Sequence, residues 1–260
     1  YIQDPWVYSA RLFHEDLDVF VLTYMFKGSE MYAFMKINNI DYKYIGVKYD
    51  GGNYSFCDVK DSSQPEYSPK ELITIIEDDK LNSIGDNYYD LSKSRYMELA
   101  EGLKRSKYCS KETGVLQDYK KKLSSYFNYI TKSGASNNIV GIYGGSESKE
   151  MEDVWDVLKY KRYATSKVNF NLKATNKYSD CHTLAYMVNI FTGGIFDHYK
   201  ERGYEVDEDN YALSTMLQWI WRSAIRKGDP ITLYVPSSRM RNLLKEWIEQ
   251  VETSRHKSIA

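Results

Sequence analysis

The sequence predicts an α/β protein in which a parallel sheet is flanked by helices. Short runs rich in β-branched and aromatic residues, typical of buried strands, alternate along the chain with segments of helical periodicity. A strand followed by a helix and another strand needs a crossover, which is the connection of parallel sheets. At 260 residues the chain is long enough for one large α/β domain or two small ones.

Residues 1–50 predict the first part of this α/β domain. Asp18–Tyr24 has the composition of a buried strand, Glu30–Asn38 that of a short helix, and Tyr42–Val47 that of a second strand. This order of elements is that of a parallel unit with a helical crossover.

Residues 51–136 predict a mainly helical, Lys-rich insertion. The expected elements are an edge strand at Asn53–Val59 and helices at Glu71–Glu77, Leu91–Lys107 and Val115–Lys132. Between Lys93 and Lys122 there are nine Lys or Arg against four acidic residues. This patch, which ends in Lys120, Lys121 and Lys122, is either a phosphate-contacting surface or a solvated helical face.

Residues 137–260 return to the α/β pattern and predict the remainder of the domain. The expected strands are Ile139–Tyr143, Val168–Leu172 and Ile231–Val235, and the expected helices are Glu147–Leu158, Thr183–Phe191, Ile195–Arg202 and Arg239–Glu252. Gly144-Gly145-Ser146 precedes one of these helices and could hold an anion there, although a plain strand-to-helix turn explains it better.

The stretch Ala212–Val235 predicts an amphipathic helix that ends at Gly228-Asp229-Pro230 and leads into a strand. Its apolar side consists of Leu213, Leu217, Ile220 and Ala224. Its other side carries a row at i, i+4 spacing, made of Ser214, Gln218, Arg222 and Arg226. Because Arg presents a planar fork of donors, this row is either a phosphate-binding surface or the polar outer face of a core helix.

Composition narrows the classes of function. A net charge of −1 argues against a protein that coats nucleic acid by bulk charge, but it leaves a local basic groove open. The 25 Tyr residues suit cores, protein interfaces and base stacking alike. The sequence has no phosphate loop of the G-x-x-x-x-G-K-[ST] kind, no G-x-S-x-G and no H-E-x-x-H, so it lacks the parts of a self-sufficient hydrolase.

The cysteines indicate a reduced, cytoplasmic location. Cys57, Cys109 and Cys181 are odd in number, widely spaced and free of metal-ligand spacing with the four His residues. We therefore expect no disulfide framework and no metal site. No apolar run approaches the roughly 18 residues of a membrane span, and the sequence predicts neither a signal peptide nor a membrane partner.

A polar loop follows the strand expected at Val168–Leu172. It contains Lys173, Thr175 and Asn176. Ligands of parallel α/β sheets gather beyond the carboxyl ends of the strands, so these donors could meet a phosphate or a nucleic-acid backbone. Capping of the loop by Thr and Asn explains the same residues equally well.

The segment Gln218-Trp-Ile-Trp-Arg222-Ser-Ala-Ile-Arg226 resembles the last motif of superfamily-two helicases, usually Q-x-x-G-R-x-x-R. LTYMFKGS, DDKLNSIGD, NFNLKATNKY and LQWIWRSAIRKGDPITLYVPSSRMRNLL resemble parts of the C-terminal half of helicase-like proteins of phages and mobile elements. This sequence departs from the family at three positions. Trp221 stands where the motif has glycine, Arg226 lies one residue late, and Lys173 stands where arginine is expected.

The resemblance implies a RecA-like α/β domain, the second domain of a two-domain motor. Arg222 and Arg226 would then reach ATP as arginine fingers, with Gln218 in the same motif and Arg222 the better placed of the two. The Lys173–Asn176 segment would couple ATP to nucleic acid. ATP and Mg²⁺ would be held by the absent first domain, so this chain alone should bind neither and should not be catalytic.

The sequence therefore favours the C-terminal domain of an ATP-dependent DNA or RNA helicase or translocase. Its nucleic-acid contacts are expected from Lys173, Thr175, Asn176, Lys120, Lys121 and Lys122. An alternative is a non-enzymatic helicase-like module that binds nucleic acid or a protein partner through a Tyr-rich surface. A self-contained nucleotide-processing enzyme is the weakest hypothesis, because the phosphate loop is missing.

Overall fold

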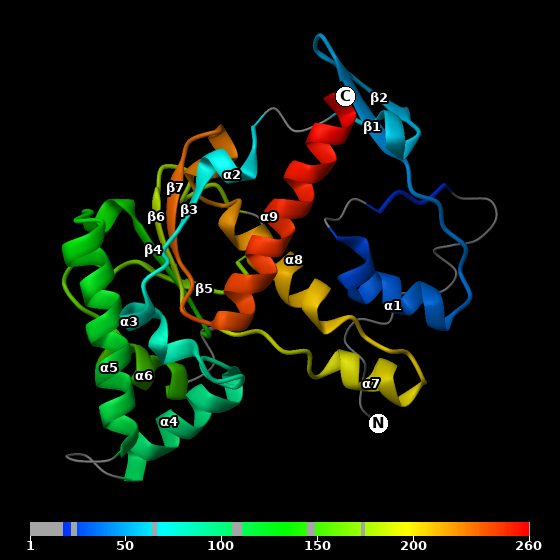
Figure 1. The fold of residues 1–260 in the computed structure, drawn as a ribbon. Helices are drawn as coiled ribbons and strands as arrows, with labels where there is room; N and C mark the ends of the chain where they lie inside the picture. Colours follow the sequence, from blue (N-terminus) through cyan, green and yellow to red (C-terminus); the bar gives the residue numbers. More distant parts are fainter. Residues whose placement is uncertain are drawn as a thin grey trace.

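A five-stranded parallel sheet forms the centre of the molecule (Figure 1). The structure is a computed structural model and describes residues 18–21, 25–63, 67–105, 111–144, 149–172 and 175–259. The strands, in their order across the sheet, are β3 (Ile73–Ile75), β7 (Ile231–Tyr234), β6 (Thr183–Tyr186), β4 (Asn138–Ile142) and β5 (Lys167–Asn169). The predicted fold class, a parallel sheet flanked by helices, is confirmed.

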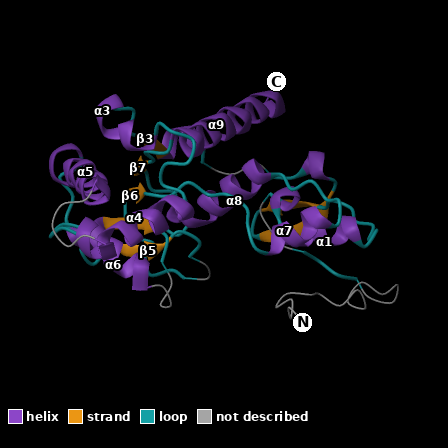
Figure 2. Ribbon diagram, turned by 90° about the horizontal axis from the view of Figure 1, so that it is seen from below, coloured by secondary structure: helices purple, strands orange, loops and turns teal. Residues whose placement is uncertain are grey.

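Helices cover both faces of the sheet (Figure 2). On one side, α4 (Lys93–Arg105), α5 (Lys111–Ser125) and α6 (Lys149–Leu158) pack against one another. On the other side lie α8 (Glu208–Ile220) and α9 (Ser238–Ile259). The chain advances across the sheet from β3 to β4 and β5, then returns to β6 and β7. Because parallel crossovers are right-handed, this reversal puts the two sets of helices on opposite faces.

The central strands are buried along their whole length, as expected for a sheet covered on both faces. The helix predicted at Thr183–Phe191 is wrong, since its first four residues are β6 and the rest runs on without helix. A short apolar run does not distinguish a strand from a buried helix, and here burial between β4 and β7 selects the strand. The helix predicted at Glu71–Glu77 is also wrong: α2 (Pro69–Leu72) ends where the β-branched segment Ile73–Ile75 begins.

The N-terminal part does not supply the strands predicted for the sheet. No strand of the five-stranded sheet comes from the described residues before position 51. Helix α1 (Glu30–Ile37) forms as predicted, but β1 (Gly46–Asp50) pairs antiparallel with β2 (Asn53–Cys57) and stands apart from the sheet (Figure 1). The positive φ angles of Gly51 and Gly52 allow the two-residue turn, so a local hairpin forms in place of a crossover. Of the strand predicted at Asp18–Tyr24, residues 22–24 lie outside the described residues and 18–21 form no strand.

The segment predicted as an insertion, residues 51–136, contributes to the sheet. It supplies β3, and its helices α4 and α5 form the crossover from β3 to β4. The same crossover contains the short helix α3 (Asp79–Asn82), which precedes α4. It also contains a π-helical turn at Tyr126–Ile130, which extends α5. The helices expected there are therefore part of the α/β domain itself.

A second, smaller core lies beside the main one. It joins α1 to α7 (Ile195–Glu201) and contains Ala33, Phe34, Met35, Phe196 and Tyr199. This lobe reaches α8 through Gly28, where a Cβ would come within 2.6 Å of the Asn210 carbonyl carbon. Glycine is therefore needed for the close approach of the two backbones.

Many of the 25 Tyr residues serve the core. Buried phenols donate hydrogen bonds to backbone carbonyls of other elements: Tyr96 to Met187 at 2.8 Å, Tyr126 to Thr232 at 2.8 Å and Tyr234 to Leu81 at 2.6 Å. A buried Tyr thus packs as an aromatic ring and also satisfies a carbonyl away from water. This role in the core accounts for part of the high tyrosine content, whose purpose the sequence alone did not decide.

We predict that Gly141→Ala destabilises the fold by about 1–3 kcal/mol through overpacking. Gly141 lies in β4, and a Cβ there would sit 2.8 Å from Tyr186 Cδ2 and 2.9 Å from Trp219 Cζ2. Both rings are buried and have little room to move. Urea unfolding followed by tryptophan fluorescence measures the change. The matched control is Gly114→Ala in α5, where a Cβ meets nothing within 4 Å and helix propensity should add up to about 1 kcal/mol. Equal stability of the two variants would contradict the prediction.

We predict that the protein loses stability as the pH rises above about 10. Burial raises the pKa of Tyr119 and Tyr163 to about 12, and it raises that of Tyr96 well above its ordinary value. In the unfolded chain these phenols ionise near pH 10, so from there the unfolded state binds fewer protons and is favoured. Urea midpoints between pH 8 and 11.5 should show this fall. Tyr96→Phe should be less stable at pH 8 but show a shallower loss above pH 10; an unchanged slope would argue against the buried phenol.

Candidate functional site

The amino ends of the parallel strands lie along one edge of the sheet, where the segments that lead into them meet. Arg162, before β5, donates to the carbonyls of Lys132 and Ser133, before β4, at 3.2 and 3.1 Å. His182, before β6, lies with Nδ1 2.9 Å from the carbonyl oxygen of Pro230, before β7. The His182 amide also donates to Asn137 Oδ1 at 2.7 Å and joins the two pairs. These contacts fix the four segments 131–137, 159–166, 175–182 and 221–230 as one surface, which we call the amino edge.

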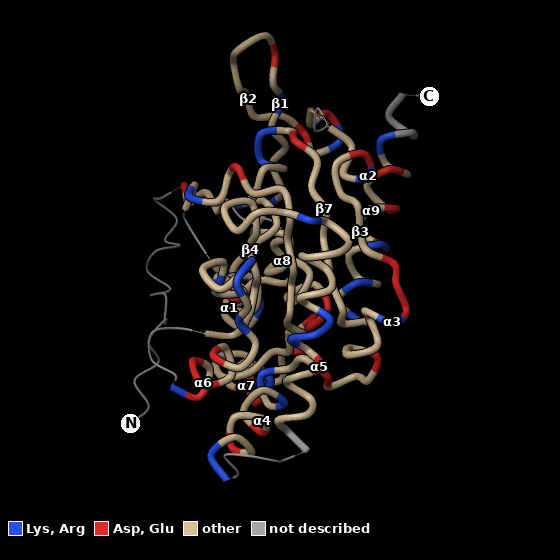
Figure 3. Tube along the Cα trace, turned by 90° about the vertical axis from the view of Figure 1, so that its left-hand side faces the viewer, with Lys and Arg blue, Asp and Glu red and all other residues tan. Residues whose placement is uncertain are grey.

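The amino edge is strongly basic. Its Lys and Arg residues are Lys132, Lys159, Lys161, Arg162, Lys177, Arg222, Arg226 and Lys227. The same segments contain only two acidic residues, Asp180 and Asp229, although the whole chain has a net charge of −1. Lys227 pairs with Asp180 at 2.5 Å, and Lys159 pairs with Asp156 of α6 at 2.7 Å. Figure 3 shows Lys and Arg along the chain trace in blue and the acidic residues in red. Such a local excess is the electrostatic pattern of a phosphate-binding surface.

Two of the sequence-predicted segments meet at this edge. Arg226 Nη1 donates to Asn176 Oδ1 at 2.5 Å. The sequence placed Asn176 beyond the carboxyl end of a strand at Val168–Leu172, but β5 ends at Asn169 and the chain has returned to the amino edge by Asn176. Lys173 lies outside the described residues. Thr175 accepts a hydrogen bond from the Lys177 amide at 3.2 Å, which is the loop-capping role considered for it.

The predicted row of Gln218, Arg222 and Arg226 on one helix does not form. Helix α8 ends at Ile220, and Arg226 lies in the following 3-10 turn, Ala224–Lys227. Gln218 donates to Ser214 Oγ at 3.1 Å, within its own helix. Arg222 is half-buried, and among the described residues its buried Nε finds no hydrogen-bond partner.

The three lysines of α5 lie on a helix that the amino edge contacts through the backbone, since the Tyr163 hydroxyl donates to the Lys120 carbonyl at 3.5 Å. Lys122 Nζ donates to the carbonyl of Lys80, in α3. Lys121 is exposed and Lys120 is half-buried. They remain predicted nucleic-acid contacts on a helix that adjoins the amino edge.

The opposite, carboxyl edge contains the topological switch point of the sheet. β4 and β6 are neighbours, but the chain leaves β4 for α6 on one face and β6 for α8 on the other. In open α/β sheets, ligands bind in the crevice outside the carboxyl ends of two such strands. Here Tyr143 follows β4, and its phenol donates to the carbonyl of Asn189, beyond β6, at 2.5 Å.

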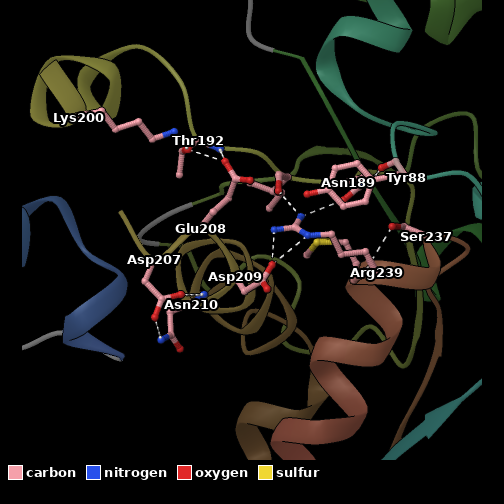
Figure 4. A network of polar contacts seen from close by, with 12 residues as sticks. Tyr88, Asn189, Thr192, Lys200, Asp207, Glu208, Asp209, Asn210, Ser237 and Arg239 are labelled. Carbon is pink, nitrogen blue, oxygen red and sulfur yellow. Dashed lines mark hydrogen bonds and ion pairs between the residues drawn. The ribbon is translucent and has the colours of Figure 1, made fainter. Parts of the chain in front are cut away.

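Arg239 is the centre of a polar network at this point (Figure 4). It lies in the first turn of α9, and its Nε and Nη2 bond Asp209 Oδ1 at 3.0 and 2.6 Å. Nη1 donates to Asn189 Oδ1 at 3.1 Å and to the carbonyl of Ile190 at 2.6 Å. The guanidinium also lies 4.8 Å from the centre of the Phe191 ring. With its side chain only 11% exposed, Arg239 is held in one geometry.

Glu208 forms the second half of the network. Its Oε1 accepts hydrogen bonds from the amide and hydroxyl of Thr192 at 2.9 and 2.5 Å, and Lys200 Nζ donates to the same hydroxyl at 3.2 Å. Partial burial opposes ionisation of Glu208, but the two Thr192 donors and the Arg239 and Lys200 cations outweigh it and lower its pKa. The carboxylate therefore stays charged and fixes the start of α8 to the chain leaving β6.

Sequence reasoning missed the carboxyl-edge residues because it assigned Thr183–Phe191 to a helix. One signal could have found them. The run that contains β4 ends in Gly144-Gly145, and the run that contains β6 ends in Gly193-Gly194, so both have the form of a strand that leads into a helix. Pairing these two runs would have placed Asn189 to Thr192 at a carboxyl end.

A metal cluster and a membrane-spanning helix are both absent from the described residues. No group of three or more His, Cys, Asp or Glu is arranged to hold a metal ion there. Within the same residues, no helix combines the length and apolar character needed to cross a bilayer.

The chain is similar to a known family and to a prophage-derived protein. A family model described as the YonV C-terminal Rossmann-like domain matches residues 67–248. The SPbeta prophage-derived uncharacterized protein YonV of Bacillus subtilis is 35% identical over 249 residues, which is 94% of this chain and 55% of that protein. The chain thus spans about half the length of this relative. No solved structure gives a significant match.

Proposed function

We propose that this chain, which belongs to the family of the YonV C-terminal Rossmann-like domain, binds the phosphate backbone of DNA or RNA along its amino edge. The charge of that edge carries the proposal: eight cations against two acidic residues in a chain of net charge −1. Each phosphate contact made by Lys or Arg releases condensed counterions, so a compact basic surface binds nucleic acid without a basic chain.

Exposed tyrosines lie beside the basic surface. Tyr160 belongs to the segment before β5 and is 43% exposed. Tyr129, in the turn just before the segment that leads into β4, is 76% exposed. Single-stranded nucleic acid is commonly bound by cations along the backbone and by aromatic rings under the bases. The combination therefore favours a single strand.

We further propose that the domain serves an ATP-dependent helicase or translocase within a longer protein. The contact between Arg226 and Asn176 favours this, because it joins the two segments that carry the helicase resemblance. ATP and Mg²⁺ would be bound by another domain of that protein. Arg222, whose buried Nε has no partner among the described residues, would supply the arginine finger.

A protein-binding module is the second candidate, and the β1–β2 hairpin favours it. Val47, Tyr49, Tyr54 and Phe56 pair across its strands on one face and are all exposed. Lys48 and Asp50 fall on the other face. Aromatic protein contacts respond weakly to salt, whereas phosphate contacts weaken steeply, so salt dependence distinguishes the two candidates.

We predict that Lys161→Gln/Lys177→Gln weakens binding of a fluorescent 20-nucleotide single strand. Both side chains are exposed at the amino edge. Loss of two phosphate contacts should lower the slope of log Kd against log salt by about 1.4. Fluorescence anisotropy between 50 and 200 mM salt measures it. Lys43→Gln/Lys48→Gln removes the same charge near and within the hairpin and should bind like the wild type; equal weakening by both variants, or no binding by the wild type, would refute the amino-edge proposal.

We predict that Arg222→Ala in the longer protein lowers nucleic-acid-stimulated ATP hydrolysis by about 10³-fold or more. Binding of the single strand should change by no more than the loss of one phosphate contact, because the finger acts on ATP. Arg222→Lys is the matched variant, since it keeps the charge but lacks the planar fork. Steady-state phosphate release measures turnover, and turnover retained in Arg222→Ala would exclude the finger role.

A further inference from the structure

The β1–β2 hairpin presents a row of aromatic rings apart from the main sheet (Figure 1). Val47 pairs with Phe56 and Tyr49 pairs with Tyr54, so these four side chains fall on one face of the hairpin. Phe20 extends the row, because its ring stacks on Phe56 at a centroid distance of 5.3 Å. The four rings are from 50% to 76% exposed, so neither core covers them. We call these five residues the hairpin face.

A neighbouring segment holds the hairpin in shape. The Ser63 amide donates to the Val47 carbonyl at 3.0 Å, and the Tyr49 amide donates to Ser63 Oγ at 2.7 Å. Because these backbone groups of β1 point away from β2, both cross-strand pairs of the hairpin face are of the non-hydrogen-bonded kind, whose side chains lie closest together. The rings of Tyr49 and Tyr54 accordingly lie 4.8 Å apart. The hairpin face is therefore arranged before a partner binds, and association would cost little side-chain freedom.

The chemistry of the hairpin face selects an apolar partner. The charged residues of the two strands are Lys48 and Asp50, and both fall on the other face of the hairpin. A partner with a strongly charged surface would lose hydration against the rings without gaining an ion pair. A contiguous exposed apolar patch marks an interaction surface, and here the matching surface is another apolar one.

Area and charge favour a second copy of this chain as that partner. At about 200 Å² for a whole aromatic side chain, the exposed parts of the four rings amount to roughly 500 Å². Two copies packed face to face would remove about 1,000 Å² from water, which reaches the lower size of a specific protein interface. The net charge of −1 adds little repulsion between copies. A two-fold axis places the same apolar residues on both sides, so the surface complements itself.

We propose that two copies of this chain associate through their hairpin faces, packed against each other across a two-fold axis. Tyr54 and Phe56, the most exposed of the rings, form the centre of the interface, and Lys48 and Asp50 remain in water on its outer side. The hairpin is the surface that favours a protein-binding module, and this inference names its partner. It does not depend on phosphate binding at the amino edge.

Sedimentation velocity of the whole chain between about 1 and 100 µM tests the association. The wild type is expected to form dimers and no larger species, because a two-fold contact closes on itself. Tyr54→Ser/Phe56→Ser should raise the dissociation constant of the dimer about 100-fold or more, since the two central aromatic side chains are lost. The dimer should persist as salt is raised to about 500 mM, because salt screens contacts between charges but not contacts between apolar rings.

The matched control is Tyr88→Ser/Tyr89→Ser. These tyrosines are 54% and 66% exposed, and they contact Phe191 beyond β6, so their loss should leave the dissociation constant unchanged. Circular dichroism and the urea midpoint establish that both double variants are folded. The proposal is overturned if the wild type is monomeric at 100 µM, if larger species grow with concentration, or if the two double variants dissociate alike. A monomeric wild type that still binds the single strand would overturn the association alone, so its failure is distinguishable from failure of the amino-edge proposal.

Discussion

The packing of Trp219 on the backbone of Gly141 positions both functional edges. Trp219 is near the end of α8 and fully buried, and no side chain at Gly141 separates its ring from strand β4. Helix α8 is thereby seated against the centre of the sheet and runs from its carboxyl edge to its amino edge. Its first turn carries Glu208 and Asp209 to the switch point, and the chain beyond its last turn carries Arg222 and Arg226 to the basic surface.

The two edges differ because parallel strands have different ends. At the amino edge, short segments lead directly into β4, β5, β6 and β7, and Arg162 and His182 tie them together through backbone carbonyls. Of the cations there, Lys159 and Lys227 pair with Asp156 and Asp180, and the cations outnumber the acidic residues of these segments. At the carboxyl edge, Arg239 is engaged by Asp209 and Asn189, and Glu208 is engaged by Thr192. The amino edge suits long-range attraction of a polyanion, whereas the carboxyl edge offers directional hydrogen bonds in a fixed frame.

The sequence predicted those elements whose local signals agree with their burial. Ile231–Tyr234 is β-branched and follows Gly228-Asp229-Pro230, and α9 begins after Pro236-Ser237, so both were found. Thr183–Tyr186 was missed because Leu, Ala, Tyr and Met suit a helix as well as a strand, and only its place between β4 and β7 decides. The hairpin was missed because the positive φ angles of Gly51 and Gly52 allow a tight turn, so that β1 pairs with the adjacent β2 and not with a distant strand through a crossover. The meeting of Asn176 with Arg226 was not predicted, because the sequence placed Asn176 beyond the carboxyl end of a strand at Val168–Leu172, whereas β5 is only three residues long.

Because α8 spans the sheet, a displacement of the chain at one edge can be transmitted to the other edge through this helix. At its first turn, Thr192 and Arg239 hold Glu208 and Asp209, and these bonds also fix the chain that leaves β6. At its far end, the Ala224 amide donates to the Cys181 carbonyl just before β6, at 3.0 Å. The segments that enter and leave β6 are therefore bonded to the chain at the two ends of α8, which Trp219 seats on the sheet. A displacement of α8 along its axis would strain both sets of bonds together, so the two edges form one mechanical unit.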